Sequence, residues 1–243
     1  MRIHSDSRSG VNGSYSELTT LKKLYKRDRL LSDVAYRTLR DAITRGMFDE
    51  GERLADRRIA ESLELSRTPV REALQRLESE GFIRNVPRIG LVVAEVTPQD
   101  IEDIYVIRIA LEGVAARLAA QHASTADIAL LKQINEQIAV ATRKHDLQGL
   151  QSLNKQFHEA IYEAARNPRL ATLLNTMHDM VQRLRRSTLS VPQRADEALK
   201  EHEMIIEAIQ ARDPERAEAL AREHKEKAKL VRMALYHRQA VAR

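Results

Sequence analysis

The sequence contains no cysteine and no tryptophan, and only 4% of its 243 residues are aromatic. Without cysteine, disulfides and thiolate metal sites are excluded. No apolar run approaches the roughly 18 residues of a membrane span, and the polar N-terminus lacks the apolar segment of a secretory signal. We therefore expect a cytoplasmic protein without membrane contact, with a core of aliphatic side chains.

Charge is almost balanced, with 40 Lys and Arg against 35 Asp and Glu, a net charge of +5. Such an excess favours acidic partners without identifying one. Residues 1–28 are rich in Ser, Gly, Lys and Arg, which predicts a mobile basic tail. The pattern then changes twice, so we predict one domain over residues 29–97 and a second over residues 98–243.

Residues 29–97 carry three short amphipathic segments followed by two strand-like ones. Apolar residues recur at helical spacing in "LSDVAYRTLRDAITRG", "DRRIAESLEL" and "SRTPVREALQRLESEGFI". The segments "FIRNV" and "LVVAEV" flank the turn "PRIG", which predicts a hairpin. Three helices and a hairpin in this order indicate a winged helix-turn-helix.

The third of these helices has two contrasting faces. One face is apolar, and the other presents Arg67, Arg71 and Gln75 at steps of four residues. Thr68 is the expected N-cap, with Ser66 just before it. Arginine pairs bidentately with guanine, and hydroxyl groups at a helix N-terminus bind phosphate. This arrangement is typical of a recognition helix in DNA.

Net charge does not explain DNA binding by this domain. Residues 29–97 contain 12 Arg, no Lys and 12 acidic residues, so the domain is neutral overall. Binding must therefore depend on where the arginines lie, and planar bidentate recognition suits an all-arginine set. Arg57, at the start of the second helix, and Arg88, in the hairpin turn, are further candidates.

At these residues a family resemblance emerges. The segment "LADRRIAESLELSRTPVREALQRLESEGFIRNVPRIGLVV" resembles the DNA-binding domain of the GntR family of bacterial transcription regulators. The resemblance implies a wing that enters the minor groove through Arg88 and Gly90. It also implies DNA contacts by residues of the second and third helices: Arg57, Ser66, Arg67, Thr68 and Arg71.

Residues 98–243 read as helical throughout. Thr97 is an expected cap with Pro98 at the first helical position, and cap or breaker residues divide the rest. Six amphipathic helices predict an all-α bundle, which makes the whole chain mainly α. The expected helices span residues 98–122, 124–144, 146–166, 168–190, 192–211 and 213–238.

Histidines in three of these helices suggest a metal site. Asn154 and His158 lie four residues apart on one helix face, while His202 and His224 lie on separate helices. Three imidazoles and an amide oxygen that converge inside a bundle would bind a divalent metal. The chain has eight histidines, however, so the alternative is that these three lie on the surface.

The second half of the chain also resembles a known domain. The segments "IYVIRIALEGVAARLAA", "FHEAIYEAARNPRL" and "EHEMIIEAIQARDPERAEALAREH" resemble the FCD ligand-binding domain of the FadR branch, VanR-like subgroup. The resemblance implies a divalent metal, zinc above all, held by His158, His202 and His224. The family's aspartate is replaced by Asn154, which removes one negative charge from the site.

The same resemblance assigns a role to Arg108. It implies an effector pocket in which the Arg108 guanidinium clamps the carboxylate of a small organic or sugar acid. Glu112 lies one helical turn further along and is included in that site. The alternative is an Arg–Glu ion pair on the surface of the helix.

We therefore expect a homodimeric, effector-controlled repressor that binds a double-stranded DNA operator and is not an enzyme. Two alternatives stay open. One is a helical metal-dependent hydrolase that uses the three histidines with Glu159 or Glu201 as base. The other is a DNA-coating protein without sequence preference, which would show a steep dependence of binding on salt.

Overall fold

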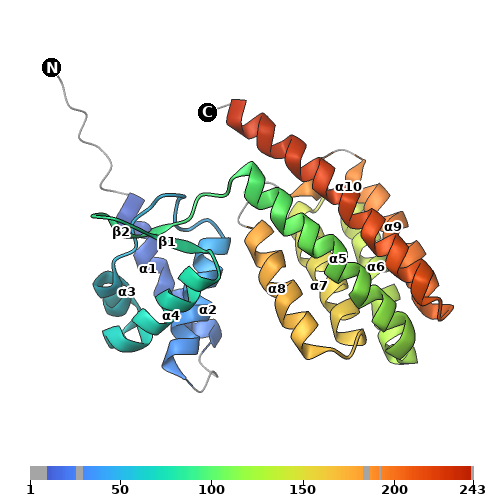
Figure 1. Ribbon diagram of the computed structural model, residues 1–243, viewed down its shortest axis with the longest axis horizontal. Helices are drawn as coiled ribbons and strands as arrows, with labels where there is room; N and C mark the ends of the chain where they lie inside the picture. Colours follow the sequence, from blue (N-terminus) through green and yellow to red (C-terminus); the bar gives the residue numbers. More distant parts are fainter. Residues whose placement is uncertain (1–9, 26–29, 183–186, 192, 242–243) are drawn as a thin grey trace. The chain divides into compact units, whose positions relative to one another are not determined.

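The computed structural model describes residues 10–25, 30–182, 187–191 and 193–241 (Figure 1). The chain divides into two compact units, Met1–Val96 and Thr97–Arg243. This division lies one residue from the boundary expected from the sequence.

The first unit contains the expected winged helix-turn-helix. Its strands pair antiparallel, with Ile83 opposite Val93. The apolar faces of its helices form the core, in which Leu39, Leu63 and Leu74 are almost wholly buried. Its elements are α2 (Leu31–Thr44), α3 (Asp56–Leu63), α4 (Arg67–Ser79), β1 (Ile83–Val86) and β2 (Gly90–Val93).

The start of α4 differs from the expectation. Its N-cap is Ser66, not Thr68, and Thr68 lies within the first turn. Ser66 has the extended backbone of an N-cap residue, although its side chain makes no capping hydrogen bond. The helix ends as expected, because Gly81 follows with a positive φ of 76°.

The expectation of a mobile tail over residues 1–28 is wrong for the part that the structure describes. Gly10–Lys22 forms helix α1, followed by the 3₁₀ turn η1 (Lys23–Tyr25). Tyr15, Leu18 and Leu21 are spaced three residues apart, and all three are buried. This short apolar face packs on α2 and α3 and fixes the helix, whereas residues 1–9 and 26–28 lie outside the described residues.

The second unit is the expected helical bundle. Thr97 and Ser124 form capping boxes that start its first two helices. The expected helix over residues 168–190 is too long, because α8 ends at Gln182 and a separate 3₁₀ turn, η2 (Thr188–Ser190), follows. The α-helices are α5 (Pro98–His122), α6 (Thr125–Arg143), α7 (Leu147–Ala164), α8 (Pro168–Gln182), α9 (Arg194–Gln210) and α10 (Pro214–Val241).

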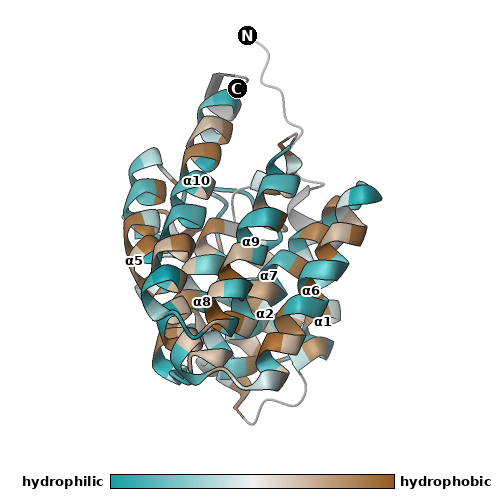
Figure 2. Ribbon diagram, turned by 90° about the vertical axis from the view of Figure 1, so that its right-hand side faces the viewer, coloured by the Kyte–Doolittle hydropathy of each residue, from teal (hydrophilic) through white to brown (hydrophobic). Residues whose placement is uncertain are grey.

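Apolar faces hold this bundle together. Apolar and polar residues alternate along α6, α7 and α9, as helices with one buried face require (Figure 2). Helix α5 turns small residues inward, including Ala115, Ala116 and Ala119, and packs along α10. At Gly113 a Cβ atom would lie only 2.7 Å from Cγ of Arg222, so glycine permits this close approach.

Candidate functional site

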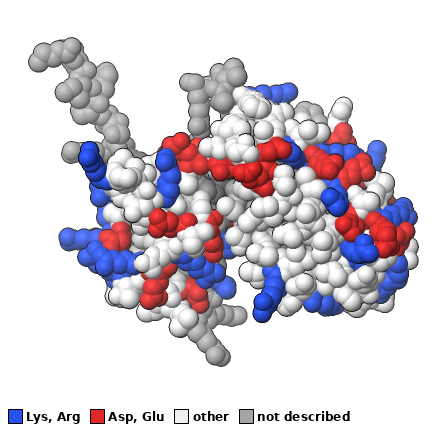
Figure 3. Space-filling model, viewed as in Figure 1, with Lys and Arg blue, Asp and Glu red and all other residues white. Residues whose placement is uncertain are grey.

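The polar face of α4 is exposed, as a DNA-reading surface requires. Ser66, Arg67, Thr68, Arg71 and Gln75 are all exposed. Lys and Arg side chains gather at the edge of this unit where α3 lies (Figure 3). The structure therefore brings these predicted contact residues to one surface of the first unit.

An acidic residue that the sequence analysis missed organises this surface. Asp56, the first residue of α3, accepts hydrogen bonds through one oxygen from Arg67 (Nη2, 2.8 Å) and Arg71 (Nε, 2.9 Å). These hydrogen bonds from the two arginines lower the pKa of the Asp56 carboxyl. Asp56 thus couples the start of α3 to the exposed polar face of α4.

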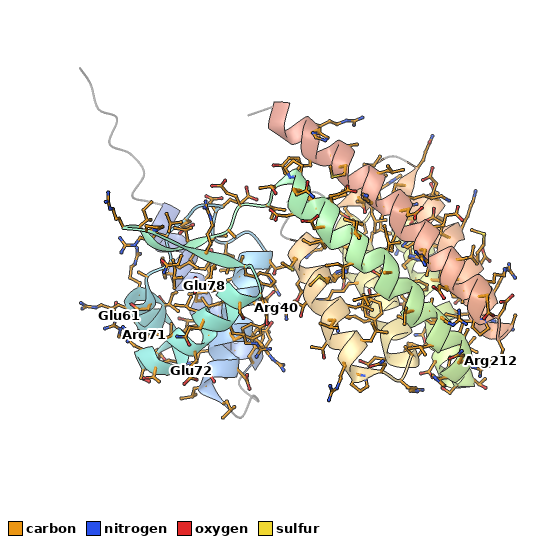
Figure 4. All side chains as sticks on the ribbon, in the orientation of Figure 1. Arg40, Glu61, Arg71, Glu72, Glu78 and Arg212 are labelled. Atoms are coloured by element: carbon orange, nitrogen blue, oxygen red, sulfur yellow. The ribbon has the colours of Figure 1, made fainter. Side chains whose placement is uncertain are left out.

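Arg57 and the wing complete the surface. The Arg57 guanidinium lies 2.9 Å from Glu61, one turn along α3, and is exposed. Glu61 and Arg71 are drawn at the same edge of the unit (Figure 4). In the wing, Arg88 and Gly90 both have positive φ, 68° and 96°, so the hairpin turn holds Arg88 exposed at its tip.

A small buried cavity of about 40 Å³ lies in the second unit. This volume takes only a few water molecules, so the cavity must widen to admit an organic acid. No acidic side chain is among the described residues that line it. The polar residues that line it are Tyr105, Arg108, Asn154, His158, His178, Thr188, Arg194, His224, Lys225 and Arg232.

The three predicted histidines converge beside this cavity. One nitrogen from each of His158, His202 and His224 lies within 4.8 Å of the other two, and all three side chains are buried. Burial lowers the pKa of each, that of His224 to about 4, which favours the neutral form that metals bind. The alternative of three surface histidines is therefore wrong. Asn154 lines the same cavity.

A carboxylate orients one of these imidazoles. His224 Nδ1 lies 2.6 Å from a carboxylate oxygen of Glu201. The other ring nitrogen of His224, Nε2, takes no part in this contact. Arg194 donates two hydrogen bonds to the same carboxylate, at 2.7 and 3.1 Å. Burial alone would raise the pKa of Glu201, but the contacts with His224 and Arg194 hold that pKa at about 2. A carboxylate this acidic makes a poor general base.

Lys225 lies among the histidines, and the sequence analysis did not single it out. Its Nζ lies 2.9 Å from Nε2 of His158 and 3.0 Å from Oε2 of Glu112. Burial lowers the pKa of Lys225 to about 7, while Glu112 opposes the shift. The three imidazoles alone fit a divalent metal, but the amino group of Lys225 already contacts one of them. In the sequence Lys225 belongs to "EHKEKAK", which has the composition of a solvated helix face.

Arg108 and Glu112 form an ion pair that is buried, not on the surface as the alternative supposed. Arg108 Nη2 lies 2.7 Å from Glu112, and each side chain is only 4% exposed. Burial would raise the pKa of Glu112, but Lys225 and Arg108 together hold it below the usual value. Glu112 thus pairs with two of the cations around the cavity, Arg108 and Lys225. His178, to which we assigned no role, is also buried at the cavity.

Each of the two units contains a segment that matches a known protein family. Residues 31–93 match the gntR family of bacterial regulatory proteins, and residues 103–227 match the FCD domain. The chain belongs to the GntR family of regulators with an FCD domain. It is thus a DNA-binding transcription regulator, not an enzyme, and the hydrolase alternative is wrong.

Individual relatives agree with this assignment. The chain is 32% identical to the HTH-type regulator YdhC of Bacillus subtilis over 184 residues, 75% of this chain and 82% of YdhC. It is 30% identical to the gluconate operon repressor of the same organism, over 74% of this chain and 75% of that one. The structure of Escherichia coli McbR/YncC superposes with a TM-score of 0.71 at 26% identity, covering 86% of this chain and all of McbR.

Within the described parts of the chain, every helix is too short or too polar to cross a lipid bilayer.

Proposed function

We propose that this regulator is an operator-specific repressor whose DNA affinity is controlled by a small carboxylate effector in the bundle. The observation that carries the proposal is the buried, basic cavity in the domain that matches FCD. Relatives named as operon repressors support repression as the mode of action. An effector exerts such control only if it binds the DNA-competent and incompetent states with different affinity.

On the DNA side, we propose that a homodimer places two copies of α4 in successive major grooves of a pseudo-palindromic operator. Arg67, Arg71 and Gln75 would face the bases, and Ser66 and Thr68 the phosphates. Arg57 would contact the backbone, and Arg88 and Gly90 would approach the minor groove. The protein would act in the cytoplasm, where its operator is found.

On the effector side, a carboxylate is the group that buried arginines recognise best. Arg108, Arg194 and Arg232 all line the cavity, and Glu112 and Glu201 hold the first two in place. The carboxylate of a small organic or sugar acid would replace some of the Arg–Glu contacts with contacts of its own to the arginines. This exchange gives the effector a physical means to change how α5, α9 and α10 pack.

A divalent metal, with zinc the expected ion, is part of this proposal as an assisting group. His158, His202 and His224 would hold it, with Asn154 as the fourth candidate ligand. When bound, it would supply a fixed positive charge to which an effector carboxylate is attracted.

Thermal denaturation with a panel of small acids tests the proposal. The panel holds monocarboxylates, dicarboxylates and sugar acids, each beside its uncharged amide as the control. We expect at least one acid, and not its amide, to raise the unfolding temperature and to change operator binding. If every amide acts like its acid, or no acid alters operator binding, the carboxylate-effector proposal is wrong.

A further inference from the structure

The position of Lys225 bears directly on what the histidine pocket binds. Its side chain is only 5% exposed, and it follows His224 directly in α10. The ammonium group contacts His158 on α7 and Glu112 on α5. It therefore joins three helices at the point where the three imidazoles meet.

The contact with His158 occupies an atom that a metal needs. A charged lysine has three N–H donors and no lone pair, so His158 Nε2 accepts the hydrogen bond with its lone pair. A metal ion would take that same lone pair at a distance of about 2.0–2.1 Å. The ion would then lie close to the lysine nitrogen, where two positive charges repel strongly in a buried site.

The surrounding charges reinforce this conflict. The charged side chains among the described residues that line the cavity are Arg108, Arg194, Lys225 and Arg232, and none of these lining residues is acidic. A divalent metal would therefore enter a cavity whose charged lining groups are all cationic. The neutral amide of Asn154 does not offset that charge.

We propose that Lys225 is the resident cation of the histidine pocket, which excludes a divalent metal while it contacts His158 and presents an ammonium group to an anionic ligand. The inference concerns the same pocket as the proposed effector site. It makes metal binding conditional on displacement of Lys225 from His158.

Zinc titration of the full-length protein tests this inference. Zinc is stripped with a chelator, and its affinity is then measured by competition with a chromophoric chelator. The variants are Lys225→Met and Lys225→Gln, and the second keeps a hydrogen-bond donor toward Glu112 if the first disturbs folding. Lys229→Met is the matched control, because Lys229 lies one turn further along α10 and pairs with Glu102 instead.

We expect both Lys225 variants to bind one zinc per chain about tenfold or more tightly than the unaltered protein. The Lys229→Met variant should match the unaltered protein. Adding His202→Ala to Lys225→Met should abolish the gain, which assigns the ion to the histidine cluster.

Two results would overturn the inference. One is a folded Lys225 variant that binds zinc no more tightly than the unaltered protein, and the other is a gain that survives His202→Ala. The titration contains neither effector nor DNA. Its failure is therefore distinct from a failure of the proposed carboxylate control, which the acid panel tests separately.

Discussion

Asp56 contacts Arg67 and Arg71, the two arginines proposed to face the bases, in different ways. Arg71 contacts Asp56 through Nε, and among the described residues its two Nη groups have no hydrogen-bond partner. Arg67 contacts the same oxygen through both Nε (3.3 Å) and Nη2 (2.8 Å), so of its two Nη groups only Nη1 keeps both N–H donors outside this contact. A free pair of Nη groups suits bidentate pairing with guanine. Arg71 is therefore the better placed of the two to read a base.

Replacement of Arg71 by alanine tests this role. We expect specific operator binding to weaken by about 1–3 kcal/mol, with relaxed preference at one base pair, because a bidentate contact is lost. Titration of labelled operators with single base changes measures both effects. Arg117→Ala is the control, since Arg117 pairs with two carboxylates in the second unit. An equal loss on every sequence would instead make Arg71 a phosphate contact.

Replacement of Asp56 by asparagine is expected to lower the specificity of DNA binding rather than the non-specific affinity. In Asp56→Asn the arginines lose their charged acceptor, and the DNA surface loses a negative charge. We expect the ratio of specific to non-specific affinity to fall while non-specific binding holds or strengthens. Both affinities are measured at one salt concentration. A parallel loss of both would mean that Asp56 only supports the fold.

At the scale of elements, α1 extends the DNA-binding unit beyond the part that matches the GntR family, which begins at residue 31. The Tyr15 hydroxyl bridges Arg53 and Ala55 just before α3, accepting from the amide of Ala55 and donating to the carbonyl of Arg53. At the other end of α3, the Thr19 hydroxyl donates to the Ser62 carbonyl at 2.6 Å. Helix α1 thus holds both ends of α3.

Two leucines of this N-terminal segment give a matched test of the packing. Leu18 is fully buried, whereas Leu24, in η1, is 63% exposed. We expect Leu18→Ala to lower the free energy of unfolding of the first unit by about 2–5 kcal/mol, and Leu24→Ala by less than about 0.5 kcal/mol. Urea denaturation measures both. Equal, small effects would show that α1 does not pack on this unit.

Elements with strong local signals were predictable from the sequence. Thr97 and Ser124 carry capping boxes, so the starts of α5 and α6 were predicted to within one residue. Helix α1 was missed because Tyr15, Leu18 and Leu21 lie among Ser, Glu, Thr and Lys, so composition outweighed spacing. The N-cap of α4 was misplaced because two hydroxyl residues only two positions apart, Ser66 and Thr68, offered equal signals.

The pocket was predicted only in part, for a geometric reason. His158, His202 and His224 were identified from spacing and resemblance. The contacts of Lys225 with His158, and of Glu201 with His224, depend on how separate helices cross. Likewise, Asp56 and Arg71 are 15 residues apart and meet only through the turn between α3 and α4. No local pattern encodes such pairs.

At the scale of the whole molecule, the buried histidines make stability depend on pH. Their pKa values lie below 6.5 in the folded chain, so below about pH 6.5 the unfolded chain binds more protons. Stability therefore falls as pH falls, by up to about 1.4 kcal/mol per pH unit for each group. The depressed pKa values of Glu112 and Glu201 act in the same direction below about pH 4.5. The histidines concerned are His158, His178, His202 and His224.

Urea denaturation near pH 7 and near pH 5 measures this dependence. We expect His178→Asn to show a smaller loss of stability between the two pH values, because one depressed pKa is removed. His122→Gln is the control, since His122 is exposed and should leave the loss unchanged. Equal stability of the unaltered protein at both pH values would contradict the assignment of neutral buried histidines.

The proposed function depends most on sequence-specific reading of an operator by α4. The most direct test is selection of fragments from the source genome by the purified protein, followed by footprinting of the best site. We expect a short pseudo-palindrome with half-sites about one helical turn apart, beside one operon. Enrichment of fragments without a shared motif would contradict it, and the protein would then be one that coats DNA irrespective of sequence.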